Sequence, residues 1–141
     1  MSACTFFGHR DCTESIKPKL RETLIDLIEN HEVNMFYVGN HGQFDAIVRG
    51  TLKELKAAYP HIDYAVVLAY LPGKGTGHMD YSETMLPEGI EKVHPRFAIS
   101  WRNKWMLKHS DYVIGAVSHS WGGATQFVEM AERQKKQVIK L

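Results

Sequence analysis

The segment at residues 62–71 constrains the fold most, because it is apolar almost throughout. A strand with one face in water alternates apolar and polar residues, whereas a strand covered on both faces reads as a continuous apolar run. Strands of the second kind belong to parallel sheets that carry helices on both sides. This segment therefore predicts an α/β protein.

Short apolar segments and amphipathic helical segments alternate along the rest of the chain. Further strands are expected at 4–7, 33–38, 112–117 and 138–141, and helices at 16–28, 44–59, 95–106 and from Gly122 onward. Five strands alternating with four helices predict a doubly wound parallel sheet with helices on both faces, a Rossmann-like fold. The 141 residues fit a single domain that spans residues 1–141.

One long segment, residues 72–94, interrupts this alternation. It contains four glycines, two prolines and a cluster of polar residues. A loop of this length inside a compact domain is typical of a lid, a binding loop or an oligomer arm. We therefore expect part of the domain here, not a linker.

Charge and composition limit the partners. The 17 basic and 16 acidic side chains give a formal net charge of +1, which supplies no strong field for a polyanion, so nucleic acid is not expected as the main partner. Cys4 and Cys12 have neither disulfide-framework nor zinc-ribbon spacing, which indicates reduced thiols. No signal peptide and no apolar run of membrane-spanning length are present, so a cytoplasmic protein without membrane contact is expected.

Residues 110–131 read as a buried strand, a polar turn and a helix opened by two glycines. Free backbone N–H groups and the positive end of a helix dipole meet at such a turn, which favours an anion such as a phosphate. A glycine-rich turn of purely structural importance has the same appearance. The expected ligand-binding residues of this turn are Ser118, His119, Ser120, Trp121, Gly122, Gly123, Ala124 and Thr125.

A second polar turn, Gly8, His9, Arg10 and Asp11, follows the first strand. Arg10 suits bidentate binding of phosphate, and Asp11 suits a ribose hydroxyl; alternatively Asp11 caps a helix and Arg10 is a surface charge. A metal site built from this turn is disfavoured because ligands so close in sequence have poor coordination geometry. We expect no metal and no cofactor.

The two polar turns face one pocket if the first and fourth of the five predicted strands are neighbours, because ligands of open α/β sheets bind where the winding reverses. Asn40, in the turn that closes the second strand, is counted with the binding residues.

Arg102 and Glu129 form a third group of candidates. Facing one pocket, a guanidinium and a carboxylate could bind a ribose or stabilise the cation formed when a glycosidic bond breaks. Arg102 could instead stack on neighbouring tryptophans, and Glu129 could be a solvated helix residue.

Four segments together resemble one family: TFFGHRDC, FYVGNHGQFD, RFAISWRNKWM and SDYVIGAVSHSWGGATQFVEMA. They are similar to the SLOG superfamily, Rossmann-like proteins that include the LOG phosphoribohydrolases, the DprA DNA-processing proteins and the YpsA-like (DUF1273) bacterial proteins. The small YpsA-like group looks most similar.

The LOG enzymes carry an Arg followed four residues later by Met, and a PGGxGTxxE motif. Arg102 and Met106 match the first pattern, and the glycine pair and Glu129 match the second. The resemblance thus implies that Arg102 and Glu129 occupy catalytic positions. Trp121 stands in place of the motif's Pro, and Thr125 in place of its third Gly.

The first functional expectation is a protein that binds a nucleotide or ADP-ribose-like small molecule, as a sensor or a sequestering protein. The resemblance would extend this to capture of a defence-signalling nucleotide. The alternative is a LOG-like nucleoside 5′-monophosphate phosphoribohydrolase, which hydrolyses an N-glycosidic bond. A homodimer or higher homo-oligomer is also expected, because Trp101, Trp105 and the long segment offer apolar surface.

Overall fold

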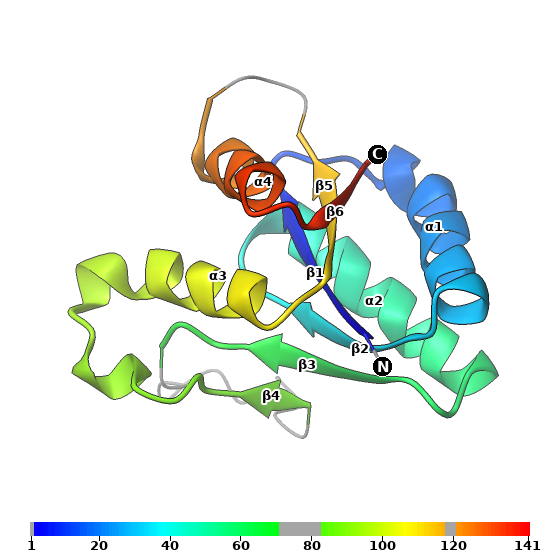
Figure 1. Cartoon of the computed structure of the whole chain (residues 1–141), viewed down its shortest axis with the longest axis horizontal. Coiled ribbons are helices and arrows are strands. Elements are labelled where there is room, and N and C mark those ends of the chain that lie inside the picture. The colour runs from blue at the N-terminus through cyan, green and yellow to red at the C-terminus, as the bar shows by residue number, and fades with distance from the viewer. Residues whose placement is uncertain (1, 71–82, 118–120) are drawn as a thin grey trace.

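The computed structural model describes residues 2–70, 83–117 and 121–141, whose elements are labelled in Figure 1. The strands are β1 (Ser2–Gly8), β2 (Val33–Val38), β3 (Asp63–Val67), β4 (Thr84–Met85), β5 (Tyr112–Ala116) and β6 (Gln137–Lys140). The α-helices are α1 (Lys17–Asn30), α2 (Gly42–Ala58), α3 (Ala98–Lys108) and α4 (Gly123–Arg133). Short 3-10 helices, η1 (Glu14–Ile16), η2 (Ile90–Lys92) and η3 (Pro95–Phe97), complete the described elements.

All six described strands form one parallel sheet in the order β4-β3-β2-β1-β5-β6. The chain winds from β1 outward to β4 and then crosses back to place β5 on the other side of β1. The winding therefore reverses between β1 and β5, at the middle of the sheet. This is the position at which Rossmann-like folds bind ligands, beyond the carboxyl ends of the strands.

Helices cover both faces of the sheet, as the apolar segments predict (Figure 1). On one face, α1 and α2 pack with Phe6, Phe36 and Ile114 of the strands. On the other face, α3 and α4 pack with Phe7 and Val113. The predicted Rossmann-like α/β fold is confirmed.

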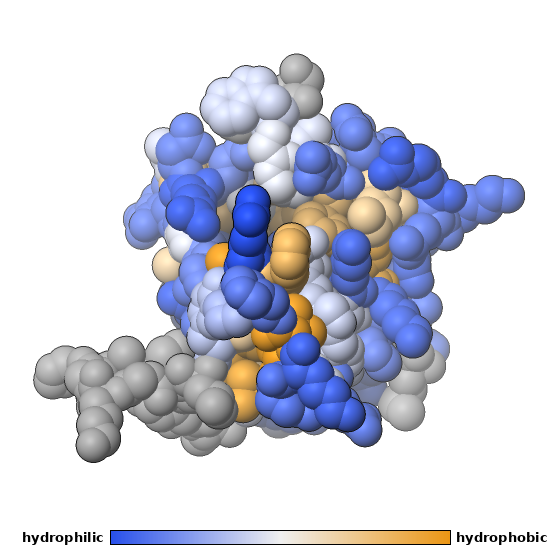
Figure 2. Space-filling view, turned by 90° about the vertical axis from the view of Figure 1, so that its left-hand side faces the viewer, coloured by the Kyte–Doolittle hydropathy of each residue, from blue (hydrophilic) through white to orange (hydrophobic). Residues whose placement is uncertain are grey.

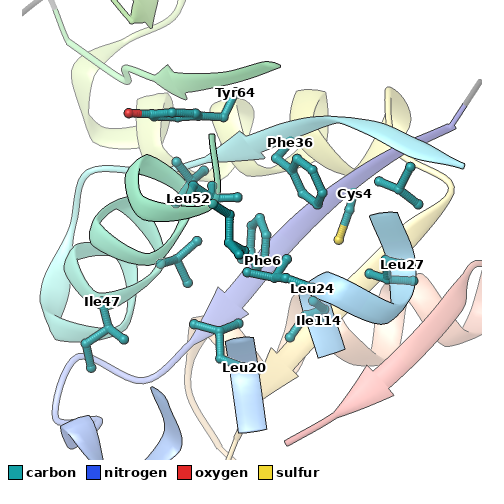
Figure 3. Close-up of a cluster of buried hydrophobic side chains, with 14 of the residues drawn as sticks. Cys4, Phe6, Leu20, Leu24, Leu27, Phe36, Ile47, Leu52, Tyr64 and Ile114 are labelled. Carbon is teal, nitrogen blue, oxygen red and sulfur yellow. The ribbon is translucent and has the colours of Figure 1, made fainter. Parts of the chain in front are cut away.

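The core on the α1 and α2 side is the larger of the two. Figure 3 shows Leu20 and Leu24 of α1 and Leu52 of α2 gathered around Phe6, which is 1% exposed. The rings of Phe6 and Phe36 stack with their centroids 6.2 Å apart, so adjacent strands are joined by side-chain packing as well as by the ladder. This packing fixes the carboxyl ends of β1 and β2 relative to the start of α2.

The end of β3 differs most from the expectation. β3 ends at Val67, although the apolar run continues. Leu68 and Ala69 are nevertheless buried, and Ala69 packs in a small cluster with Ile90 and Ala98 beside the sheet. A continuous apolar run therefore marks burial here, not the length of a strand.

The expected long irregular segment, 72–94, is described from residue 83 onward. This part contains the two-residue strand β4, which pairs with β3 and brings the described strands to six, and the 3-10 helix η2. A strand of only two residues is too short to show the alternation of apolar and polar residues, which is why sequence periodicity does not reveal β4.

Trp101 and Trp105 are partly buried within the chain itself. Trp105 packs edge-on against Tyr37 with ring centroids 5.2 Å apart, and Trp101 lies against Gly89. Part of each ring stays exposed, and the homo-oligomer that was predicted from these tryptophans and the long segment stays a prediction. Within the described ranges, no helix has the length and apolar character needed to cross a membrane.

Candidate functional site

The turn after β1 lies at the reversal point of the sheet. The backbone N–H of His9 donates to the carbonyl oxygen of Ala116, 3.3 Å away, and extends the β1–β5 pairing by one residue. A Cβ on Gly8 would lie 2.2 Å from the ring of Phe44, so only glycine lets the start of α2 pack this closely against β1. Close packing of this kind brings the turns after β1 and β2 together.

The turn after β2 supplies a buried carboxylate. Asp45, in the first turn of α2, is 9% exposed, and its Oδ2 accepts the backbone N–H of His41 at 3.0 Å. This bond resembles half of a capping box, in which an acid in the first turn satisfies a free N–H at the helix start. A Cβ on Gly39 would lie 2.7 Å from Oδ2 of Asp45 and 3.0 Å from Nη1 of Arg102, so the glycine leaves room for both groups.

Arg102 of α3 is 2% exposed and is held by several hydrogen bonds. Its Nε donates to Oδ1 of Asn103 at 2.8 Å, and its Nη1 donates to the carbonyl oxygen of Val67 at 3.0 Å and to Oδ1 of Asn40 at 3.3 Å. Its Nη2 lies 3.4 Å from Nδ1 of His41. A guanidinium only donates, so Nδ1 of His41 accepts and the neutral ring carries its proton on Nε2.

Burial shifts the titration of this cluster. Burial lowers the pKa of Arg102, opposed by the nearby charge of Asp45. Burial raises the pKa of Asp45 above the usual aspartate range, opposed by the His41 N–H and by Arg102 and Arg49. Burial and then the three arginines 102, 10 and 49 lower the pKa of His41, so its neutral form persists to lower pH than in water.

The start of α4 forms the opposite wall. Gly122, the residue before the helix, has φ of 103°, a conformation that favours glycine, and it has no side chain with which to cap the helix. A Cβ on Gly123 would meet nothing within 4 Å, so packing among the described residues does not require a glycine there. Trp121, which precedes the pair, is 69% exposed.

A pocket of about 420 Å³, open to solvent on one side, lies between the ends of β1 and β5, α3 and the start of α4. The volume lies within the range of small-molecule sites. Figure 2 shows the side of the molecule toward which β3 points in Figure 1, with hydrophobic side chains gathered near the centre of this face and hydrophilic ones around them. The lining residues are Phe6, Phe7, Gly8, His9, Arg10, Asp11, His41, Asp45, Ile99, Arg102, Asn103, Met106, Trp121, Gly122, Gly123 and Ala124.

Many of the predicted binding residues lie in this pocket. The structure brings together the whole first turn, Gly8 to Asp11, and the second turn from Trp121 to Ala124. Asn40 does not line the pocket but accepts a hydrogen bond from Arg102. Thr125 is buried outside it, and its hydroxyl donates to the carbonyl oxygen of Trp121 at 3.2 Å. Ser118, His119 and Ser120 lie outside the described residues.

The two alternatives for the first turn are also resolved in part. Asp11 caps no described helix, because η1 follows Thr13 and α1 follows Ile16. Arg10 and Asp11 are both exposed and both line the pocket. They are available to a ligand.

The expected pair of Arg102 and Glu129 is not assembled. Arg102 and Met106 line the pocket, but Glu129 is exposed and is not a lining residue. Phe127, Val128 and Ala131 turn toward the sheet, and at 100° per residue this directs position 129 away from it.

Sequence reasoning missed His41, Asp45 and Asn103. Asp45 had a detectable signal: it stands between the buried helix positions Phe44 and Ile47, where a charged residue is rarely placed without a partner. His41 and Asn103 carried no such signal. Across the described ranges, no group of three His, Cys, Asp or Glu residues is arranged to hold a metal ion.

Comparison with known proteins identifies the fold. No protein-family model matches the chain, and no curated protein sequence matches it significantly. Among solved structures, the X-ray structure of DNA processing protein A (DprA) from Streptococcus pneumoniae matches with a TM-score of 0.68 and 18% sequence identity, over 99% of this chain. The chain has a DprA-like fold.

This likeness covers 50% of the DprA chain, so the present chain spans about half the length of that protein. The shared part is a Rossmann-like domain, in agreement with the fold expected from the resemblance to the SLOG superfamily. At 18% identity the match describes the architecture alone.

Proposed function

We propose that this protein binds a nucleotide or ADP-ribose-like small molecule in the pocket between β1 and β5, as a sensor or sequestering protein. The observation that carries the proposal is the convergence, in one pocket of about 420 Å³, of the exposed Arg10 and the glycines Gly122 and Gly123 at the start of α4. A guanidinium and free helix N–H groups are both donors to phosphate oxygens.

The rest of the pocket suits the remainder of a nucleotide. Trp121 offers an exposed ring at the rim, and Ile99 and Met106 offer apolar wall. Aromatic side chains of this kind bind bases by stacking, without needing a particular base. We further propose that, within the SLOG superfamily, the chain is most similar to the small YpsA-like group. The nucleotide that it captures would then be a defence-signalling nucleotide.

The test is isothermal titration calorimetry of the pure protein with AMP, GMP, CMP, UMP and ADP-ribose. We expect at least one to bind, and we expect Arg10→Ala to weaken that binding by about tenfold, the loss of one charge-assisted hydrogen-bonding group. Arg133→Ala is the matched control, because it removes the same charge from the exposed end of α4. No heat with any of the five compounds would contradict the proposal.

Hydrolysis of a nucleoside 5′-monophosphate is the second candidate. The placement of Arg102 and Met106 in the pocket favours it, and the placement of Glu129 outside the pocket does not. Incubation with each monophosphate, followed by chromatography of free base, separates the two functions. Base release that Glu129→Ala abolishes would establish the hydrolase, and unchanged nucleotide with tight binding would leave the binding function.

A further inference from the structure

Asp45 has one carboxylate oxygen in use and one available. Oδ2 accepts the His41 N–H, which fixes the side chain in the lining of the pocket. Oδ1 accepts no hydrogen bond from the described residues, and it is absent from the fully buried polar atoms that lack a partner. The side chain is therefore nine-tenths buried with one oxygen accessible from the pocket.

The neighbouring arginines do not form an ion pair with the Asp45 carboxylate within the described residues. Arg102 and Arg49 both act on Asp45 through space, yet within the described part of the chain neither forms an ion pair with it. The guanidinium of Arg102 instead donates its hydrogen bonds to Val67, Asn40, Asn103 and His41. A buried carboxylate with one oxygen that lacks a hydrogen bond is stabilised by an O–H or N–H donor of the ligand.

The same carboxylate excludes an anion from its immediate neighbourhood. A phosphate beside Asp45 would meet a like charge in a poorly solvated site, so the anionic group belongs at Arg10 and the start of α4. The pocket thus has an anion-binding end and a hydroxyl-binding end. A sugar phosphate has this arrangement of groups.

We infer that Oδ1 of Asp45 accepts the hydroxyl groups of the ligand's ribose, so that the pocket selects a phosphorylated ribose with a free cis-diol. One carboxylate oxygen has two lone pairs and can accept from both hydroxyls. The inference rests on the proposed function, because it assigns the sugar end of the same ligand. It gives Asp45 the sugar-binding role that the sequence assigned to Asp11 or to Glu129.

The experiment compares AMP with 2′,3′-dideoxy-AMP by calorimetry, using the full chain and its Asp45→Asn variant. The amide oxygen of Asn can still accept the His41 N–H, and circular dichroism verifies that the variant is folded. We expect the unmodified chain to bind AMP at least about tenfold more tightly than the dideoxy compound, as charge-assisted hydrogen bonds imply. Asp45→Asn should bind the two compounds equally.

Asp63→Asn is the matched control, because Asp63 is exposed at the opposite end of β3, where it pairs with Lys56. It should retain the full preference for AMP. Equal binding of both compounds by the unmodified chain, or a preference that survives in Asp45→Asn, would overturn the inference and leave the proposed function intact. Failure of both compounds and of the other nucleotides to bind would overturn the two together.

Discussion

Nη1 of Arg102 donates to the carbonyl oxygen of Val67 at 3.0 Å, so a buried cation joins α3 to the last residue of β3. The same nitrogen reaches Asn40 after β2. Arg102 thereby connects two strand ends on one side of the pocket to the helix on the other. In this structure it is a fixed part of the wall.

Arg102→Ala should lower the free energy of unfolding by about 2–4 kcal/mol, because it leaves the Val67 carbonyl without its donor and Asp45 without its nearest cation. Urea denaturation followed by circular dichroism measures the change. Lys104→Ala is the control, since Lys104 is exposed on the same helix, and its effect should stay within about 0.5 kcal/mol. Equal midpoints for the two variants would show that Arg102 is not structural.

Gly123→Ala should weaken AMP binding by about tenfold without destabilising the protein. A methyl group there meets nothing in the described protein, but it occupies the space in which a phosphate would approach the helix N–H groups. Gly50→Ala provides the comparison, because Gly50 also has open space around its Cβ position and lies on α2 away from this pocket. Calorimetry of both variants should show a loss for position 123 only; retention of full affinity would place the phosphate elsewhere.

The preference for AMP over 2′,3′-dideoxy-AMP should decline as the pH falls. Burial raises the pKa of Asp45, so it takes up a proton at higher pH than an ordinary aspartate, and the protonated group is a poorer acceptor for hydroxyls. His41 keeps its neutral form to lower pH than in water, because burial and the neighbouring Arg102 lower its pKa. Phosphate ionisation cancels in the ratio of the two affinities. A ratio that stays constant from neutral pH down to about 3.5, roughly the mean pKa of aspartates in folded proteins, would contradict this.

Sequence periodicity predicts the architecture because each strand and helix buries a face whose spacing is visible in the residues. The rule that ligands bind where the winding reverses then places Arg10 and Gly123 at one pocket before any coordinates are known. Asp45 and Glu129 show where this reasoning ends. A motif fixes the offset of Glu129 from the glycine pair, but the packing of Phe127 and Val128 decides which way that position faces.

Four separate stretches of chain, around residues 9, 43, 102 and 122, meet in the pocket, and no one of them contains it. Unfolding disperses all four, so a ligand that needs this pocket has no site on the unfolded chain. Binding must then stabilise the folded chain and raise its melting temperature. The free energy of unfolding increases by about 2.7 kcal/mol when the ligand is at one hundred times its dissociation constant. The melting curve therefore becomes a detector for unknown ligands: a library of metabolites can be ranked by how far each shifts it.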